Sequence, residues 1–112
     1  MTLTANTRRI FVALDTPALE KACELSLKLG DSVRYKVGLE LCTAVGVPVA
    51  LNAIGGGQNG FLDLKFDDIP NTVAGAVRAA ARKGVGMLNV HCHGGHNMMM
   101  EAAKARDKVM DE

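Results

Sequence analysis

Four short apolar runs, each followed by a segment with helical spacing, constrain the fold of this chain more than any other sequence feature. The expected strands cover residues 8–14, 33–38, 60–66 and 86–91. The expected helices follow at residues 18–29, 39–45, 71–83 and from about 97 onward, and residues 47–60 are left unassigned. Strands that alternate with helices pair in parallel through right-handed crossovers. The sequence therefore predicts an α/β fold with four βα units.

The length of 112 residues limits the chain to one domain or a portion of one. A complete eight-stranded α/β barrel takes about 250 residues, so we expect the (βα)4 portion of a TIM (β/α)8 barrel, or else a small open sheet. No linker divides the sequence, and we expect residues 1–112 to form a single partial TIM-barrel domain. An open half-barrel exposes strand edges and its inner face, so we also expect a second copy or a missing half to cover it.

Composition argues against several classes of function. A net charge of +1 gives no electrostatic reason to bind nucleic acid or a membrane surface. One Tyr, three Phe and no Trp leave little for base stacking. No apolar run approaches the roughly 20 residues of a membrane span. The three cysteines form no Cys-x-x-Cys pair and indicate reduced thiols, so we expect a cytoplasmic protein.

Polar residues recur on one face of the expected strands. Because side chains alternate along a strand, Asp63 and Lys65 lie opposite the apolar Leu62 and Leu64. We expect the apolar face to pack on helices and the charged face to point into the barrel. The same alternation places one set of inward polar residues near the strand ends: Asp15, Lys36, Asp63, Lys65 and His91. Active sites of α/β barrels form at the carboxyl ends of the strands, so this set predicts an active site.

Each of these residues taken alone also has a structural interpretation. A Lys and an Asp two positions apart can form an ion pair, and Asp15 can cap a helix that has Pro17 as its first residue. Asp67 and Asp68 precede a helix, whose N-terminus favours negative charge. Polar residues at the ends of four strands together favour an active site over separate structural roles. Charged groups close together in a protein interior are energetically unfavourable, so they are rarely retained unless they have a function.

The segment FLDLKFDDIPNTV, residues 61–73, resembles the signature of the orotidine 5′-phosphate decarboxylase family, Asp-x-Lys-x-x-Asp-Ile-Pro-Asn-Thr. IFVALD, YKVGLEL and LNVHCHGG agree with the same family in order and spacing, so the resemblance runs from about Arg9 to the C-terminus. Related phosphosugar decarboxylases and synthases share the Asp-x-Lys-x-x-Asp core, and the Ile-Pro-Asn-Thr that follows narrows the resemblance. It implies cofactor-free, metal-free decarboxylation of orotidine 5′-phosphate to uridine 5′-phosphate, in pyrimidine nucleotide biosynthesis.

The resemblance also implies roles for single residues. The catalytic residues would be Lys36, Asp63, Lys65 and Asp68. Lys65 would protonate the ring carbon that loses its carboxylate, and Asp68 would reach across a dimer interface. The substrate-binding residues would be Asp15, Ile69, Thr72 and His91. The implied partners are a small nucleotide substrate and a second subunit in a homodimer with shared active sites.

Two departures from the family pattern affect this expectation. Asp67 stands where the family usually has His. The later strands, with the loops that hold the phosphate, have no counterpart in these 112 residues. Because remote binding energy supports the rate of such an enzyme, we expect the isolated chain to be weakly active or inactive.

The sequence HCHGGH, residues 91–96, is the main support for an alternative function. Closely spaced histidines are typical of zinc sites, so a zinc-dependent hydrolase that uses His91, His93 and His96 is an alternative. The His-x-His-x-Asp-His hydrolase pattern needs an Asp where Gly95 stands, and His93 and His96 are then expected to be loop residues. A non-catalytic half-barrel fragment that associates with itself is a further alternative.

Overall fold

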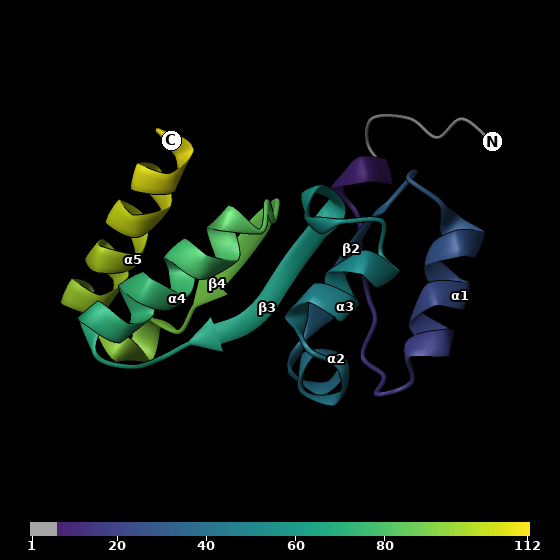
Figure 1. Ribbon diagram of the computed structural model, residues 1–112, viewed down its shortest axis with the longest axis horizontal. Coiled ribbons are helices and arrows are strands. Elements are labelled where there is room, and N and C mark those ends of the chain that lie inside the picture. The colour runs from purple at the N-terminus through teal and green to yellow at the C-terminus, as the bar shows by residue number, and fades with distance from the viewer. Residues whose placement is uncertain (1–6) are drawn as a thin grey trace.

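The computed structural model describes residues 7–112 and contains a four-stranded parallel sheet in the order β1-β2-β3-β4 (Figure 1). The strands are β1 (Phe11–Ala13), β2 (Arg34–Gly38), β3 (Gly60–Phe66) and β4 (Met87–Val90). The predicted α/β fold with four parallel strands is therefore confirmed, although β1 is shorter than expected because Thr7–Arg9 form a 3-10 turn, η1. Residues 1–6 of the predicted domain lie outside the described residues.

The helices follow the strands in the predicted alternation. They are α1 (Leu19–Leu29), α2 (Leu39–Val45), α3 (Val47–Ala53), α4 (Pro70–Arg82) and α5 (His96–Met110). The bounds predicted for α2 are confirmed, and the unassigned segment contains α3 and a 3-10 turn, η2 (Gly57–Asn59). None of the helices within residues 7–112 is long and apolar enough to cross a membrane.

The capping role considered for Asp15 is wrong. Helix α1 begins at Leu19, and its N-cap residue Ala18 makes no side-chain cap hydrogen bond. The backbone N–H of Ala18 donates to Thr16 Oγ1 at 3.1 Å, so Pro17 lies in a turn before the helix. A carboxylate four residues before the first helical position is too far away to cap it, and Asp15 is available to the site.

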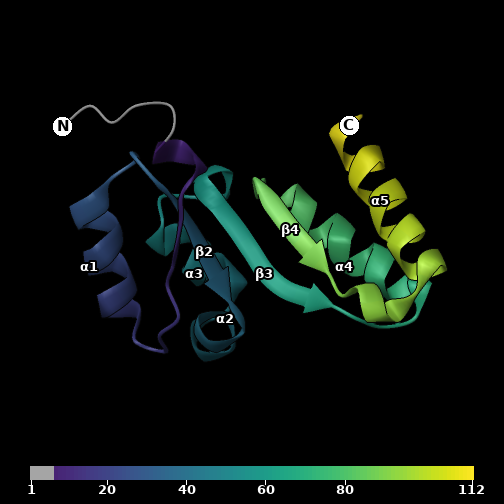
Figure 2. The ribbon, with the colours of Figure 1, turned by 180° about the vertical axis from the view of Figure 1, so that it is seen from behind.

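The two faces of the sheet differ as the alternation predicts. Tyr35, Val37 and Leu62 are at most 1% exposed and pack in an apolar cluster with residues of α1, α2 and α3. On the opposite face the Phe11 and Phe61 rings meet edge to face at 5.8 Å. A second apolar cluster joins α4 to α5, and Phe66 and Leu88 pack against both clusters. This arrangement leaves the face with the polar strand ends free of covering helices (Figure 2).

The sheet is open, since β1 and β4 each have one neighbouring strand. Helices α1, α2 and α3 lie at one end of the molecule, and α4 and α5 lie at the other (Figure 1). The molecule is elongated, with extents of 44 × 30 × 25 Å.

Candidate active site

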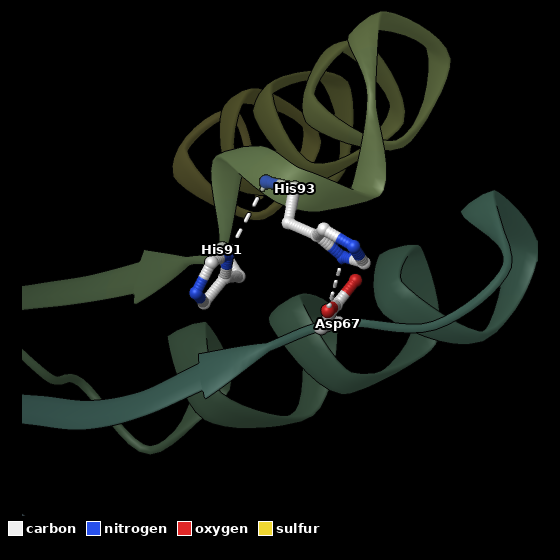
Figure 3. Close-up of side chains that lie close together, drawn as sticks. All are labelled: Asp67, His91 and His93. Carbon is white, nitrogen blue, oxygen red and sulfur yellow. Dashed lines mark hydrogen bonds and ion pairs between the residues drawn. The ribbon is translucent and has the colours of Figure 1, made fainter.

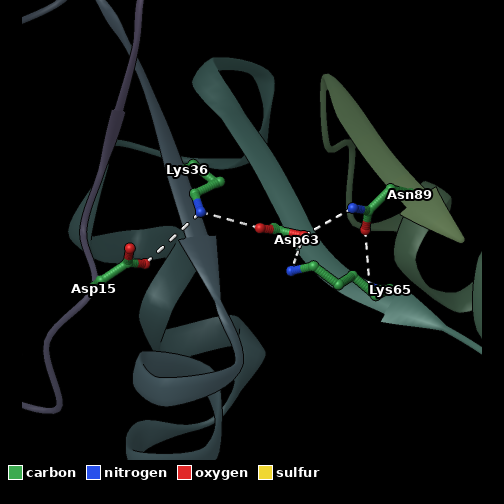
Figure 4. A network of polar contacts seen from close by, with 5 residues as sticks. All are labelled: Asp15, Lys36, Asp63, Lys65 and Asn89. Carbon is green, nitrogen blue, oxygen red and sulfur yellow. Dashed lines mark hydrogen bonds and ion pairs between the residues drawn. The ribbon is translucent and has the colours of Figure 1, made fainter. Parts of the chain in front are cut away.

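Asp63 is the centre of a polar network that spans three neighbouring strands (Figure 4). Its Oδ2 accepts a hydrogen bond from Lys36 Nζ at 3.0 Å. Its Oδ1 accepts hydrogen bonds from Lys65 Nζ and from Asn89 Nδ2, both at 2.8 Å. Asp63 is 6% exposed and is the one buried charged residue in the part of the chain that the structure describes. The structure thus joins three of the predicted catalytic residues around one carboxylate.

The sequence makes room for this carboxylate at Gly38. Gly38 pairs with Asp63 in the register between β2 and β3. A Cβ atom at Gly38 would lie 3.2 Å from the Asp63 carbonyl oxygen and 3.8 Å from the Asp63 Cβ. The absence of a side chain at position 38 therefore lets β3 bring Asp63 close to β2, within reach of Lys36.

Lys65 occupies an unusual backbone conformation. Its φ of 51° is the only positive φ among the described non-glycine residues, and the register between β3 and β4 shifts between Leu62 and Phe66. Such a conformation is unfavourable for a residue with a side chain and requires support from its surroundings. Asn89 gives that support, because its Oδ1 accepts the Lys65 backbone N–H at 2.9 Å. With this backbone conformation, the Lys65 ammonium lies 2.8 Å from Asp63 Oδ1.

Asn89 is the site residue that our list of candidates omitted. It binds Asp63 through its amide nitrogen and Lys65 through its amide oxygen, so it fixes both residues. The alternation in β4 placed Asn89 on the polar face, two residues before His91. The polar face of β4 is therefore a signal in the sequence, although a neutral amide on it is less distinctive than a charged side chain.

The network balances two cations with two anions. Asp15 completes it, with its Oδ1 3.9 Å from Lys36 Nζ. The side chains of Lys36, Lys65 and Asp15 are 26%, 51% and 62% exposed. Both ammonium groups can therefore meet a ligand that enters from the open face, while Asp63 holds them from beneath.

The pKa of the Asp63 carboxyl is lowered from 3.8 to about 2. Burial acts in the opposite direction and raises this pKa, because it penalises the charged form. The hydrogen bonds from Lys65, Asn89 and Lys36, together with the charge of Lys36, outweigh burial. Asp63 is consequently ionised at neutral pH and presents a permanent negative charge to both lysines.

The other predicted site residues lie outside this network. Asp68 Oδ1 accepts the backbone N–H of Ile69 at 2.7 Å, which is a local contact. Ile69 is 65% exposed, and Thr72 is exposed in the first turn of α4. His91 is exposed beyond the end of β4. The roles predicted for these residues involve a second subunit or a substrate. The intersubunit roles of Asp68, Ile69 and Thr72 and the substrate-binding role of His91 therefore stay predictions.

A second cluster of polar groups corrects the expected zinc ligands. It contains His91 and His93 together with Asp67, whereas His96 is the first residue of α5 and lies outside the cluster (Figure 3). His93 lies in the 3-10 turn η3 (Cys92–Gly94). The set of three histidines is therefore wrong, because the helix carries His96 away from the turn and β3 brings Asp67 to it.

Comparisons with known proteins agree with this geometry. Residues 8–110 match the model of the orotidine 5′-phosphate decarboxylase / HUMPS family. The orotidine 5′-phosphate decarboxylase of Chromohalobacter salexigens is 54% identical over 99 residues, which cover 87% of this chain and 41% of that protein. The enzyme of Marinomonas sp. is 49% identical over 104 residues, covering 91% of this chain and 44% of that protein.

A solved structure shows the same fold. The orotidine 5′-phosphate decarboxylase of Lactobacillus acidophilus superposes with a TM-score of 0.77 at 36% identity, over 89% of this chain and 46% of that one. The chain thus spans less than half the length of the relatives that it matches. The predicted partial barrel is confirmed, since four parallel strands alternating with helices match about half of the barrel in that family.

Proposed function

The chain belongs to the orotidine 5′-phosphate decarboxylase / HUMPS family, and on that premise we propose that its Asp63 network serves the decarboxylation of orotidine 5′-phosphate to uridine 5′-phosphate. The observation that carries the proposal is a pair of lysine ammonium groups held by one buried carboxylate at the carboxyl ends of parallel strands. Such an arrangement places fixed positive charge where a reaction develops negative charge.

Lys65 has the properties that this reaction needs. When the bond to the carboxylate breaks, carbon dioxide leaves and the electron pair stays on the ring carbon. An ammonium group beside that carbon stabilises the pair and then transfers a proton to it, and the neutral amine regains a proton from water. An ammonium has three donors, and Lys65 uses one of them for Asp63, so donors remain for the substrate.

Asp63 supports the proposal in a second way. Its carboxylate binds the ammonium groups of Lys36 and Lys65 at 3.0 and 2.8 Å and so fixes the position of both. In the proposed complex it also lies near the departing carboxylate, where repulsion is relieved as carbon dioxide leaves. Lys36 links this centre to Asp15, whose exposed carboxylate has free lone pairs for ribose hydroxyls.

We further propose that two copies of the chain share their active sites. Asp68, Ile69 and Thr72 form an exposed group at the start of α4, and no hydrogen bond or ion pair described for them reaches the Asp63 network. Ile69 is a large apolar side chain that is 65% exposed, and a partner subunit that covered it would remove this apolar surface from water. Light scattering during size-exclusion chromatography tests this part, and a monomer at micromolar concentration would exclude it.

The proposal includes two statements about the chain as a unit. Residues 1–112 act as one domain, and the support comes from residues 7–112, where a single sheet connects the two apolar clusters through Phe66 and Leu88. A polypeptide of these residues alone is weakly active or inactive on orotidine 5′-phosphate. The reason is that it spans 41–46% of its relatives and carries only part of the binding energy available to them.

Ligand binding tests the proposed function without requiring turnover. The probe is a uridine 5′-phosphate analogue with an oxyanion on the ring carbon that carries the carboxylate in the substrate, and calorimetry measures its affinity. We expect Lys65→Ala to weaken binding at least tenfold, since a charge-assisted contact contributes about 1.5–3 kcal/mol. The matched control is Lys28→Ala, which removes an equal charge from an exposed surface pair with Glu24. Equal affinities of the two variants would exclude the proposed site.

A further inference from the structure

The chain carries a second set of ligand groups at the same edge of the sheet, formed by Asp67, His91 and His93 (Figure 3). Each residue offers one ligand atom, and these atoms all lie within 4.8 Å of one another. The side-chain hydrogen bonds described for these residues link them to each other, and none reaches the Asp63 network. The proposed decarboxylation makes no use of Asp67 or His93, so this cluster requires its own explanation.

The fold brings the three residues together by joining two strand ends. Asp67 directly follows β3, and His91 directly follows β4. The backbone N–H of His91 donates to the Phe66 carbonyl at 2.9 Å, which fixes the two strand ends side by side. The η3 turn then folds back over β3, closed by the hydrogen bond from the Gly95 N–H to the Cys92 carbonyl at 3.1 Å.

A glycine allows this turn to approach the carboxylate. A Cβ atom at Gly94 would lie 3.0 Å from Asp67 Oδ1 and would overlap the sulfur of the buried Met98. A residue with a side chain at position 94 would therefore separate η3 from Asp67. With glycine, the turn lies directly against the carboxylate and places both imidazoles beside it.

The contacts within the cluster suit a metal ion better than they suit an ion pair alone. His93 Nδ1 lies 3.1 Å from Asp67 Oδ2, and an exposed pair of this kind contributes little to stability. His91 Nδ1 accepts the His93 backbone N–H at 3.1 Å and so caps the η3 turn. The two rings stand edge to face, with centroids 5.7 Å apart. An ion pair between Asp67 and His93 and the cap that His91 Nδ1 makes on η3 leave the Nε2 of His91 without a described hydrogen-bond partner, so this atom remains for a metal ion.

We propose that Asp67, His91 and His93 bind one divalent transition-metal ion, with zinc as the best match. Two imidazoles and a carboxylate are a common zinc donor set, with solvent as the fourth ligand. Imidazole nitrogens disfavour magnesium and calcium, which select oxygen ligands. The side chains of His93 and Asp67 are 79% and 39% exposed, so both have room to rotate toward a common ion.

The bound ion connects the end of β3 to the turn after β4. Lys65 and Asn89 lie two residues before Asp67 and His91 on these strands, so the ion also fixes the strand ends that carry part of the Asp63 network. An ion that binds the folded chain in preference to the unfolded chain raises the unfolding temperature in proportion to the logarithm of its concentration. The inference concerns metal binding only, and its test does not require turnover of any substrate.

A zinc titration of the untagged, chelator-treated 112-residue chain tests the site. Calorimetry with zinc chloride alone is expected to show one equivalent bound, with a rise in unfolding temperature at saturation. Asp67→Ala, His91→Ala and His93→Ala should each weaken binding at least about tenfold, because each removes one of three ligands. Asp67→Asn keeps the shape of the side chain and serves in place of Asp67→Ala if that variant does not fold.

Two variants of neighbouring residues are the controls. His96→Ala and Cys92→Ser alter potential ligands that lie outside the cluster, and both should bind zinc as the unmodified chain does. Absence of zinc binding by the unmodified chain at millimolar concentration would overturn the proposal. A loss of affinity in His96→Ala or Cys92→Ser as large as that in His93→Ala would also overturn it. Neither result would bear on the analogue-binding test of the decarboxylase site.

Discussion

Replacing Asp63 with Asn perturbs the candidate active site at its centre. The carboxylate accepts hydrogen bonds from Lys36, Lys65 and Asn89, and its pKa falls from 3.8 to about 2 in the folded chain. Each pKa unit corresponds to about 1.4 kcal/mol, so ionised Asp63 contributes about 2 kcal/mol to the free energy of unfolding at neutral pH. Asp63→Asn loses this contribution and leaves two ammonium groups without their shared anion.

The pH dependence gives the sharper test, because it isolates the carboxyl group. A lowered pKa means that the unfolded chain takes up the proton first as the pH falls. The stabilisation is therefore complete at pH values that are more than about one unit above the ordinary pKa of 3.8. It is lost as the pH falls toward 2. At pH 3 roughly half of it remains, so the difference in stability between the unmodified chain and Asp63→Asn should shrink by about 1 kcal/mol from pH 7 to pH 3.

Urea denaturation followed by circular dichroism, at pH 7, 5, 4 and 3, measures this difference. The two unfolding curves should be well separated at pH 7 and should approach each other below pH 4. A separation that stays constant from pH 7 to pH 3 would mean that the Asp63 carboxyl titrates alike in the folded and unfolded chains. That result would refute the reasoning that three donors hold it ionised.

Two further substitutions test how the backbone builds the site. Gly38→Ala should lower the free energy of unfolding by about 1–2 kcal/mol, since the added Cβ lies 3.2 Å from a backbone oxygen of Asp63. Its control is Gly75→Ala in α4, where the atom nearest to the added Cβ is 3.8 Å away, at the end of the flexible Arg78 side chain. This control should raise the free energy of unfolding slightly. Equal effects of the two substitutions would argue against close packing at Gly38. Lys65→Gly should be more stable than Lys65→Ala by about 1 kcal/mol, because the φ of 51° suits glycine. Urea denaturation measures the free energy of unfolding of all four variants. A Lys65→Ala variant as stable as Lys65→Gly would contradict the positive φ assigned to Lys65.

The sequence predicts the part of the fold that depends on local patterns. Alternation in β3 separates the buried Leu62 from the charged Asp63 and Lys65, and the structure confirms both faces and places Lys36 in the same network. Helix α2 follows from its spacing and from Gly46 at its end. These features need only the period of a strand or a helix and a terminating residue.

The features that the sequence does not predict depend on contacts between distant segments. The positive φ of Lys65 and the bulge in β3 require Asn89 on the neighbouring strand, 24 residues away. Asp67 meets His93 because η3 folds back over β3, and no spacing along the chain reveals that contact across 26 residues. Asp15 matched a capping pattern, yet the turn at Thr16 shifts the helix start and leaves the carboxylate facing Lys36.

The central claim is that these residues carry the catalytic groups of a decarboxylase. The most direct measurement uses a chimera in which this chain replaces the matched segment of the Chromohalobacter salexigens relative, with which it shares 54% identity over 99 residues. We predict that the chimera converts orotidine 5′-phosphate to uridine 5′-phosphate and that Lys65→Ala lowers kcat at least about a hundredfold, as expected for loss of a proton donor. A folded chimera without activity, or one whose kcat is unchanged by Lys65→Ala, would contradict the account.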